Sequence, residues 1–174
     1  MKCRLLGRHI AIGRNFRMYA PLHIGGRGAV SLGDNCQVGR IVGSPHKYTW
    51  IDALCPDSRI SIGNNARLHA ARITAKYEVT IGDDVIIEDA GIVDTDFHSL
   101  DTSRGEPLGE CSEECRISIG NRVCIGAQSI ITKGVVIGDG VVVAPSAVVS
   151  RSVKPNHFAY GNPVVSTARE DSHG

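Results

Sequence analysis

The chain of 174 residues is long enough for one domain with a sizeable core, and its 42% of hydrophobic residues excludes a disordered chain. Aromatic residues make up only 5%, so we expect a core of small branched side chains. The formal net charge is +1 and the basic residues form no block, which argues against a nucleic-acid partner.

The N-terminus lacks the apolar run that a signal peptide needs, and no stretch of about 18 apolar residues is present to span a membrane. The six cysteines form no C-x-x-C pair, so neither a zinc ribbon nor a thioredoxin-type site is expected. These features predict a cytoplasmic protein with free thiols and no metal.

Residues 1–60 are predicted to form irregular N-terminal coils of a single domain that spans residues 1–174. An Ile-Gly or Leu-Gly pair recurs along the chain, at Gly13, Gly33, Gly63, Gly82, Gly120 and Gly138. Most intervals exceed the last one, so segments must leave the repeat. One excursion is predicted between Gly43 and Ser58, where the only Trp and two prolines occur without a repeat.

Residues 61–98 are predicted to form regular coils. Hexads begin at Ile62 with IGNNAR and LHAARI, and a second block reads IGDDVI, IEDAGI, VDTDFH from Ile81 to His98. The repeat stops at His98. The polar segment 99–116 that follows is predicted to be a loop ejected from the coil.

Residues 117–154 are predicted to be the most regular part, because six hexads run without a break from residue 119: IGNRVC, IGAQSI, ITKGVV, IGDGVV, VAPSAV and VSRSVK. The fifth residue of one hexad and the first of the next lie on the same face of a strand. Val123 and Ile125 should therefore face inward and Cys124 outward. The small second residue suits a turn with positive φ.

Three short strands and three turns give a three-sided coil of about 18 residues, and coils stack at about 4.8 Å. One coil cannot bury its own apolar face, whereas a stack can. An ordinary sandwich or barrel of short strands is the alternative. The stacking predicts columns of inward side chains that pair Ile119 with Ile137, Ile125 with Val143 and Ile131 with Val149. Residues 155–174 are left as a C-terminal tail.

The chain resembles the hexapeptide-repeat acyltransferases, most closely the maltose, galactoside and polysaccharide O-acetyltransferase branch. The resemblance covers roughly residues 24 to 165. It rests on the hexads, on TDFHSLDTSRGEPLG, on RISIGNRVCIGAQSIITKGVVIGDG and on the exit KPNHFAYGNPVV. It implies an all-β fold, a left-handed parallel β-helix, in a homotrimer that uses acetyl-CoA.

The chain departs from the family pattern at three points. Cys124 stands where the family often has Trp, and VAPSAVV, with Pro145 in the middle, replaces a common Gly-Ala-Gly-Ser segment. Val164 and Val165 follow the Gly-Asn-Pro exit instead of Ala-Lys or Cys-Arg. These changes bear on the cofactor contacts rather than on the fold.

Acyl transfer from a thioester to a hydroxyl needs a base, an oxyanion donor and a groove that aligns the reactants. Histidine is the natural base near neutral pH, and the resemblance assigns that role to His98. Asp94 and Asp96 alternate with His98 and are expected to project outward beside it, since Val93 should face inward. One Asp would orient the imidazole; both also suit solvated turns.

The resemblance, the chemistry of coenzyme A and the position of the ejected loop suggest the remaining site residues. The backbone N–H of Ala127 would stabilise the oxyanion, and extended backbone would bind the pantetheine arm at Gly126, Ala127, Ala144 and Pro145. Phosphates would be bound at Ser150, Arg151 and Arg169, with Lys133 and Lys154 as alternatives. Arg104 and Glu106 of the ejected loop would wall the acceptor pocket, and neighbouring subunits would complete the site.

The sequence therefore predicts transfer of an acetyl group from acetyl-CoA to a hydroxyl of a sugar or polysaccharide precursor. N-acetylation of an amino-sugar nucleotide would use the same base and donor. Acyl-carrier-protein-dependent relatives have a longer C-terminal region. A γ-carbonic-anhydrase-like metalloprotein would need three clustered histidines, and a non-enzymatic solenoid would show a flat ladder of threonines.

Overall fold

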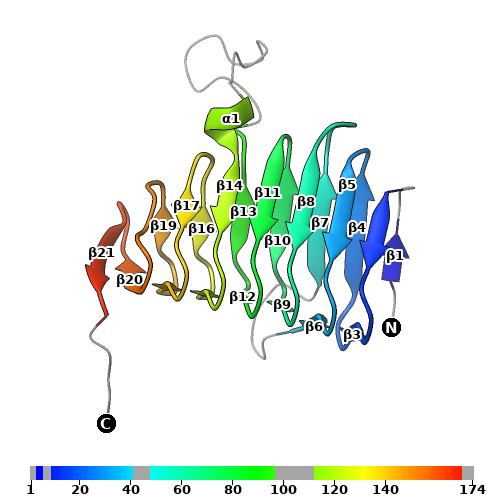
Figure 1. The fold of residues 1–174 in the computed structure, drawn as a ribbon, viewed down its shortest axis with the longest axis horizontal. Coiled ribbons are helices and arrows are strands. Elements are labelled where there is room, and N and C mark those ends of the chain that lie inside the picture. The colour runs from blue at the N-terminus through cyan, green and yellow to red at the C-terminus, as the bar shows by residue number, and fades with distance from the viewer. Residues whose placement is uncertain (1–2, 6–8, 41–47, 97–111, 170–174) are drawn as a thin grey trace.

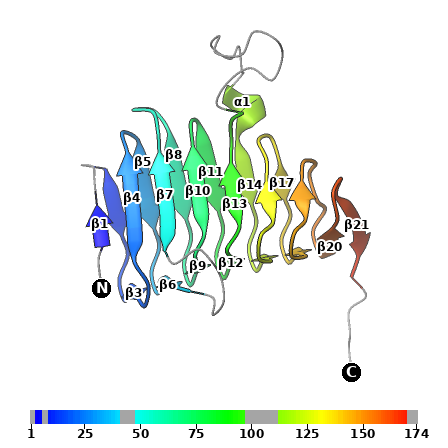
Figure 2. The same cartoon turned by 180° about the vertical axis from the view of Figure 1, so that it is seen from behind.

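The chain folds as a three-sided parallel β-helix (Figure 1; from behind, Figure 2). The computed structural model describes residues 3–5, 9–40, 48–96 and 112–169. From β1 to β19, every third strand belongs to the same sheet and pairs with the strand three places away in the chain, while β20 and β21 both join the third sheet. No helix in these ranges is both long enough and apolar enough to cross a membrane.

The strands form three sheets, called A, B and C in the order in which the chain visits them. Sheet A consists of β1 (Cys3–Leu5), β4 (Leu22–Gly26), β7 (Thr49–Ala53), β10 (Arg72–Ala75), β13 (Gly91–Val93), β16 (Ile130–Ile131) and β19 (Val148–Val149). Sheet B consists of β2 (Ile10–Ile12), β5 (Ala29–Leu32), β8 (Arg59–Ile62), β11 (Glu78–Ile81), β14 (Ile117–Ile119) and β17 (Val136–Ile137). Sheet C consists of β3 (Arg17–Met18), β6 (Gln37–Gly39), β9 (Arg67–His69), β12 (Ile86–Glu88), β15 (Cys124–Ile125), β18 (Val142–Val143), β20 (His157–Tyr160) and β21 (Val165–Ala168).

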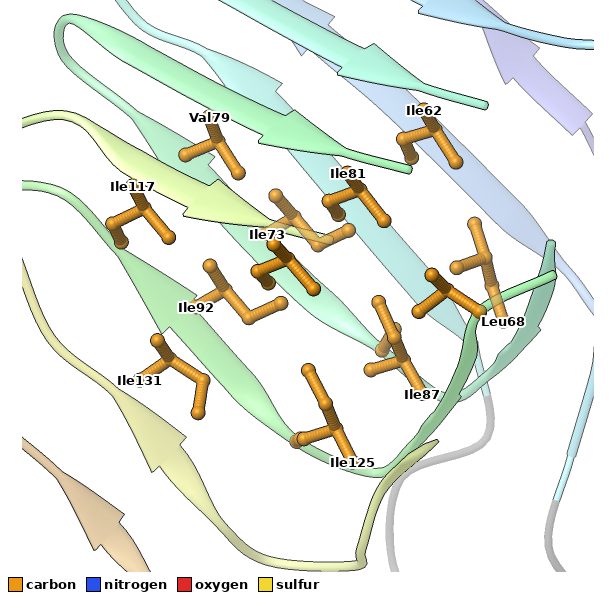
Figure 3. Packing of buried hydrophobic residues seen from close by; sticks show 14 of the residues in the cluster. Ile62, Leu68, Ile73, Val79, Ile81, Ile87, Ile92, Ile117, Ile125 and Ile131 are labelled. Atoms are coloured by element: carbon orange, nitrogen blue, oxygen red, sulfur yellow. The ribbon is translucent and has the colours of Figure 1, made fainter. Parts of the chain in front are cut away.

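The predicted columns of branched side chains are confirmed. Ile119 pairs with Ile137, Ile125 with Val143 and Ile131 with Val149, and all six side chains are buried. Val123 faces inward and Cys124 is half-buried on the outer face, as the spacing predicts. Figure 3 shows the same stacking in the middle of the molecule, where Ile73, Ile92 and Ile131 follow one another in sheet A. The core therefore runs along the axis of the helix.

The hexad register that the sequence predicts is wrong at Val93. Ile92 is buried and Val93 is only half-buried, so Val93 does not open a hexad that faces inward. Ile92 pairs with Ile73 and Ile131 instead. The corner before β13 is one residue shorter than a hexad requires, and a shift of one residue in a strand exchanges its inner and outer faces.

The excursion predicted between Gly43 and Ser58 is also shorter than expected. Thr49–Ala53 is β7, which pairs in parallel with β4 and β10. Ile51 and Ala53 are buried, while the side chain of Trp50 lies on the outer face. The strand was missed because the corner after it, residues 54–58, is too long for a hexad.

The predicted C-terminal tail contributes a hairpin to the last coil. β20 adds in parallel to β18, and β21 turns back antiparallel onto β20. This hairpin covers the edge of sheet C that would otherwise offer unpaired backbone groups. Within the segment predicted as the ejected loop, Ser112–Cys115 form the short helix α1, which stands at the corner between sheets A and B (Figure 1).

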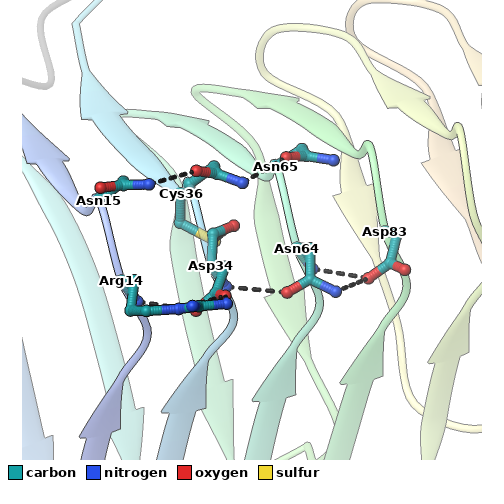
Figure 4. A network of polar contacts seen from close by, with 8 residues as sticks. Arg14, Asn15, Asp34, Cys36, Asn64, Asn65 and Asp83 are labelled. Carbon is teal, nitrogen blue, oxygen red and sulfur yellow. Dashed lines mark hydrogen bonds and ion pairs between the residues drawn. The ribbon is translucent and has the colours of Figure 1, made fainter.

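A ladder of polar side chains connects successive coils at the corners between sheets B and C (Figure 4). At each level a side-chain oxygen accepts the backbone N–H of the residue one coil earlier. Asp34 Oδ1 accepts from Arg14 at 2.7 Å, Asn64 Oδ1 from Asp34 at 2.8 Å and Asp83 Oδ1 from Asn64 at 2.6 Å. Asp and Asn alternate along this column, so like charges are never stacked at adjacent levels.

The glycines that directly follow an inward Ile or Leu at these corners serve close packing rather than the positive φ that the sequence suggested. A Cβ on Gly63 would lie 2.7 Å from the carbonyl carbon of Gly82 in the next coil. Positive φ occurs two residues further on, at Asn15, Asn35 and Asn65. Their amides also form a ladder, in which Asn15 Nδ2 donates to Asn35 Oδ1 at 3.0 Å.

The ladder predicts a loss of stability in acid. Hydrogen bonds from Arg14 hold the pKa of Asp34 below its ordinary value of 3.8. A carboxyl whose pKa is lower in the folded state stabilises the fold above its unfolded pKa, and this contribution is lost as pH falls through the folded pKa. Asp34→Asn keeps an acceptor for the Arg14 N–H, as Asn64 does one coil later. The variant should be less stable than the native chain at about pH 6, and this difference should be smaller at about pH 2. Urea unfolding measures both, and an equal difference at the two pH values would contradict the prediction.

Candidate active site

Asp94 is a buried anchor beneath the corner between sheets A and B, which we call the A–B corner. Its carboxylate accepts backbone N–H groups from Lys76 at 2.7 Å, Tyr77 at 2.8 Å and Glu78 at 2.7 Å. The side chain is 0% exposed, so the predicted outward orientation beside His98 is wrong. The shifted register of β13 turns it inward. Burial raises the pKa of the Asp94 carboxyl, and the three N–H donors oppose that rise.

Asp96 remains near the surface. Its Oδ2 lies 2.6 Å from Nζ of Lys133, and both side chains are about one third exposed. Lys133 belongs to the A–B corner of the next coil, between β16 and β17. Lys133, an alternative phosphate ligand in the sequence analysis, is therefore paired with a carboxylate. His98, Arg104 and Glu106 lie outside the described residues, and their predicted roles remain predictions.

Ala127 offers an unpaired backbone N–H at the corner between sheets C and A, the C–A corner. In the described part of the chain this N–H donates no hydrogen bond, and the carbonyl of Pro145 accepts none. Gly126 brings the two corners together, because a Cβ on Gly126 would lie 2.7 Å from the nitrogen of Pro145. The N–H of Ala144 is already bonded to the Ala159 carbonyl at 2.8 Å. This corner thus presents one donor and one acceptor, which suits an amide-containing arm.

The predicted site residues lie at different corners of the coil. Asp94 and Asp96 follow β13 at the A–B corner, whereas Ala127 and Pro145 follow β15 and β18 at the C–A corner. Sheet A separates the two corners. One chain therefore does not bring the described acid residues together with the Ala127 N–H.

The predicted phosphate ligands are divided as well. Ser150 and Arg151 follow β19 at the A–B corner, and Arg151 lines a groove of about 320 Å³ with Val164 and Val165. Its guanidinium donates to the Val164 carbonyl at 3.4 Å. Arg169 lies at the corner between sheets B and C, where its guanidinium donates to the Gly140 carbonyl at 3.1 Å. The structure does not bring Arg169 together with Arg151.

Two features of the surface were not predicted from the sequence. A groove of about 290 Å³ lies along the A–B corner, lined by Asp57, Arg59, Lys76, Tyr77, Glu78, Ser112 and Arg116. On the outer face of sheet A, His23 Nε2 lies 3.3 Å from Asp52 Oδ1 and its ring stacks on Trp50 at 3.8 Å. Gly25 was the signal in the sequence that could have indicated this pair. It alternates with His23 on the same face of the strand, and a Cβ there would lie 2.6 Å from both His23 Nε2 and Asp52 Oδ1. Within the described ranges, no three His, Cys, Asp or Glu side chains could hold one metal ion.

Comparison with known proteins supports the fold. The family model for the bacterial transferase hexapeptide (six repeats) matches residues 116–151. No curated protein sequence matches the chain. Among solved structures, the chain is similar to a galactoside acetyltransferase in complex with coenzyme A, with 23% identity and a TM-score of 0.57. That match covers 92% of this chain but 64% of the other, so the chain spans less than two thirds of that relative.

Two further structures widen the comparison. The polysialic acid O-acetyltransferase OatWY is similar at 20% identity with a TM-score of 0.63, over 96% of this chain and 94% of that one. AntD, an N-acyltransferase from Bacillus cereus, solved as a mutant with dTDP and coenzyme A, is similar at 22% identity with a TM-score of 0.51, over 92% and 84%. The chain therefore has the left-handed parallel β-helix fold of the hexapeptide-repeat acetyltransferases, and its residues 116–151 match the family model for the bacterial transferase hexapeptide.

Proposed function

We propose that the protein transfers an acetyl group from acetyl-CoA to a hydroxyl of a sugar or polysaccharide precursor. The observation that carries the proposal is the unpaired N–H of Ala127 beside the unpaired carbonyl of Pro145, among the described residues of this fold. Solved structures of similar fold hold coenzyme A or acetyl-CoA. The Pro145 carbonyl can accept a hydrogen bond from an amide N–H of the pantetheine arm, and the Ala127 N–H is left for the acyl group that the arm carries.

In this proposal His98 takes the proton of the acceptor hydroxyl as its oxygen attacks the thioester carbonyl. The Ala127 N–H donates to the oxygen that becomes negative, and the thiol leaves with the proton from His98. Asp96, paired with Lys133, lies two residues before His98 and helps to position this segment. Ser150 and Arg151 would bind phosphate at the groove that Arg151 lines. Arg169, at a different corner, is left out of this set.

The separation of the corners supports the homotrimer of this proposal. The Ala127 N–H and the segment that leads to His98 lie on opposite sides of sheet A. A neighbouring copy, packed so that its C–A corner faces this A–B corner, would bring the two together. Light scattering on the purified chain tests this arrangement, and an active monomer would contradict it.

Ala127→Pro should lower kcat by about 100-fold, because the change removes the proposed oxyanion donor and little else. Pro145 occupies the equivalent position one coil later, so proline fits this corner. The carbonyl of Ala127, which accepts the Ser146 N–H at 2.9 Å, remains. Ala127→Gly keeps the N–H and serves as the control. Native turnover in the proline variant, with an unchanged urea midpoint, would remove Ala127 from the site.

N-acetylation of an amino sugar is the second candidate, favoured by the similarity to AntD. The decisive experiment incubates the protein with acetyl-CoA and a panel of sugars, amino sugars, sugar nucleotides and oligosaccharides, and follows thiol release. Mild alkali then separates the two chemistries, because it cleaves an ester product and leaves an amide intact. If no acceptor of the panel leads to thiol release from acetyl-CoA, both candidate functions are contradicted.

A further inference from the structure

The charge of the chain is distributed unevenly along the β-helix. Residues 1–76 contain twelve Lys and Arg against three Asp and Glu, a formal charge of +9. Residues 77–174 contain seven against fifteen, a formal charge of −8. Because each coil advances the chain along one axis, this asymmetry in sequence becomes an asymmetry in space, from the blue end of Figure 1 to its red end. The N-terminal half of the rod therefore attracts anions.

The groove at the A–B corner lies where this basic half meets the segment that leads to His98. Arg59, Glu78 and Arg116 lie at three successive levels, since Arg59 pairs with Glu78 in the sheet and Arg116 directly precedes the next strand. Arg116 Nε lies 3.2 Å from Glu78 Oε2. Arg59 is exposed, and its guanidinium makes no hydrogen bond or ion pair with any described residue. A guanidinium without a partner is a ready ligand for a carboxylate.

The floor of the groove is held in place from below. The carboxylate of Asp94 binds the backbone of Lys76, Tyr77 and Glu78, whose side chains line the groove above it. Lys76 Nζ lies 5.0 Å from the centroid of the Tyr77 ring. The anchor and the groove therefore form one unit, and Asp94 stands four residues before His98 in the chain. A ligand in the groove would lie above Asp94, which precedes the proposed base by four residues.

We propose that this groove binds a carboxylate-bearing sugar residue of the acceptor, so that the acceptor is an acidic saccharide. Arg59 pairs with the sugar carboxylate, the Asp57 carboxylate accepts hydrogen bonds from the sugar hydroxyls, and the Ser112 hydroxyl donates to them or accepts from them. Arg27 lies one coil earlier at the same corner. Together with the other basic residues of this half, it attracts the part of the acidic saccharide that extends beyond the bound sugar. This inference rests on the proposed function, because it names the substrate class of the same site.

The test measures binding by calorimetry, with trigalacturonate as the acidic probe and maltotriose as the neutral probe of equal length. The native chain should bind trigalacturonate at least about tenfold more tightly than maltotriose, and high salt should weaken the binding. Arg59→Gln should lower the affinity for trigalacturonate about tenfold. Arg72→Gln is the matched control, because Arg72 is exposed on the outer face of sheet A and does not line the groove. It should change the affinity less than about threefold.

Equal affinity for the two probes, or equal losses in the two variants, would overturn the inference. Stronger binding of glucose 1-phosphate or of a single-stranded oligonucleotide than of trigalacturonate would overturn the carboxylate assignment. Arg59-dependent binding of trigalacturonate, without thiol release from acetyl-CoA on any acceptor, would leave this site in place and contradict the proposed transferase. If the protein transfers acetyl to neutral sugars and Arg59→Gln leaves that rate unchanged, the proposed transferase stands and the acidic acceptor is contradicted.

Discussion

Asp94→Ala is expected to lower the free energy of unfolding by about 4 kcal/mol, because the change leaves three backbone N–H groups without an acceptor. The N–H groups of Lys76, Tyr77 and Glu78 all point to one buried carboxylate. Each unsatisfied buried donor costs about 1–3 kcal/mol, and partial access of water to the emptied site offsets some of the sum. Urea unfolding of the native chain and the variant measures the difference.

Two variants isolate the cause. Asp94→Asn keeps one acceptor oxygen at the same place and should lose about half as much stability. Asp96→Ala removes a carboxylate two residues away, whose ion pair with Lys133 is about one third exposed, and should cost less than about 1 kcal/mol. Similar losses for Asp94→Ala and Asp96→Ala would show that the buried hydrogen bonds do not stabilise the corner.

The regular columns of the fold are predictable from the sequence because they depend only on spacing. Once Ile119 and Ile125 face inward, the residues 18 positions later must lie beside them, and they do. Local corner lengths are not predictable in this way. The corner before β13 is one residue shorter than the hexads suggest, and this single residue decides that Ile92 and Asp94 face inward. A spacing rule cannot detect such a change, because either register leaves an apolar residue to bury.

The same limit explains the incomplete prediction of the site. Ala127 was assigned by resemblance, and its unpaired N–H is consistent with that assignment. The groove at the A–B corner was not predicted, because Arg59, Lys76 and Arg116 come from three coils and meet only when these coils stack. Single basic residues spread over 76 positions form no block in the sequence. The stacking of coils gathers them into one half of the molecule.

His98→Ala is expected to lower kcat by roughly 100-fold or more, up to about 10⁴-fold, because the acceptor hydroxyl loses its base. A histidine base must be neutral to act, so the native rate should fall as pH drops through the ordinary histidine pKa of about 6.5. The slow residual rate of the variant should not fall in this pH range, because the variant has no imidazole to protonate at this position. Thiol release, measured against pH with a saturating acceptor, tests both statements.

The structure supplies a matched control, because His23 lies on the outer face of sheet A and is paired there with an aspartate. Its Nε2 is 3.3 Å from Asp52 Oδ1 and its ring stacks on Trp50. His23→Ala should leave kcat within about threefold of the native value, while light scattering shows the same assembly for both variants. Native turnover in His98→Ala would contradict the assignment of the base. If His23→Ala instead showed the larger loss, the imidazole that takes the proton would be the one beside Asp52, since a carboxylate already orients it there.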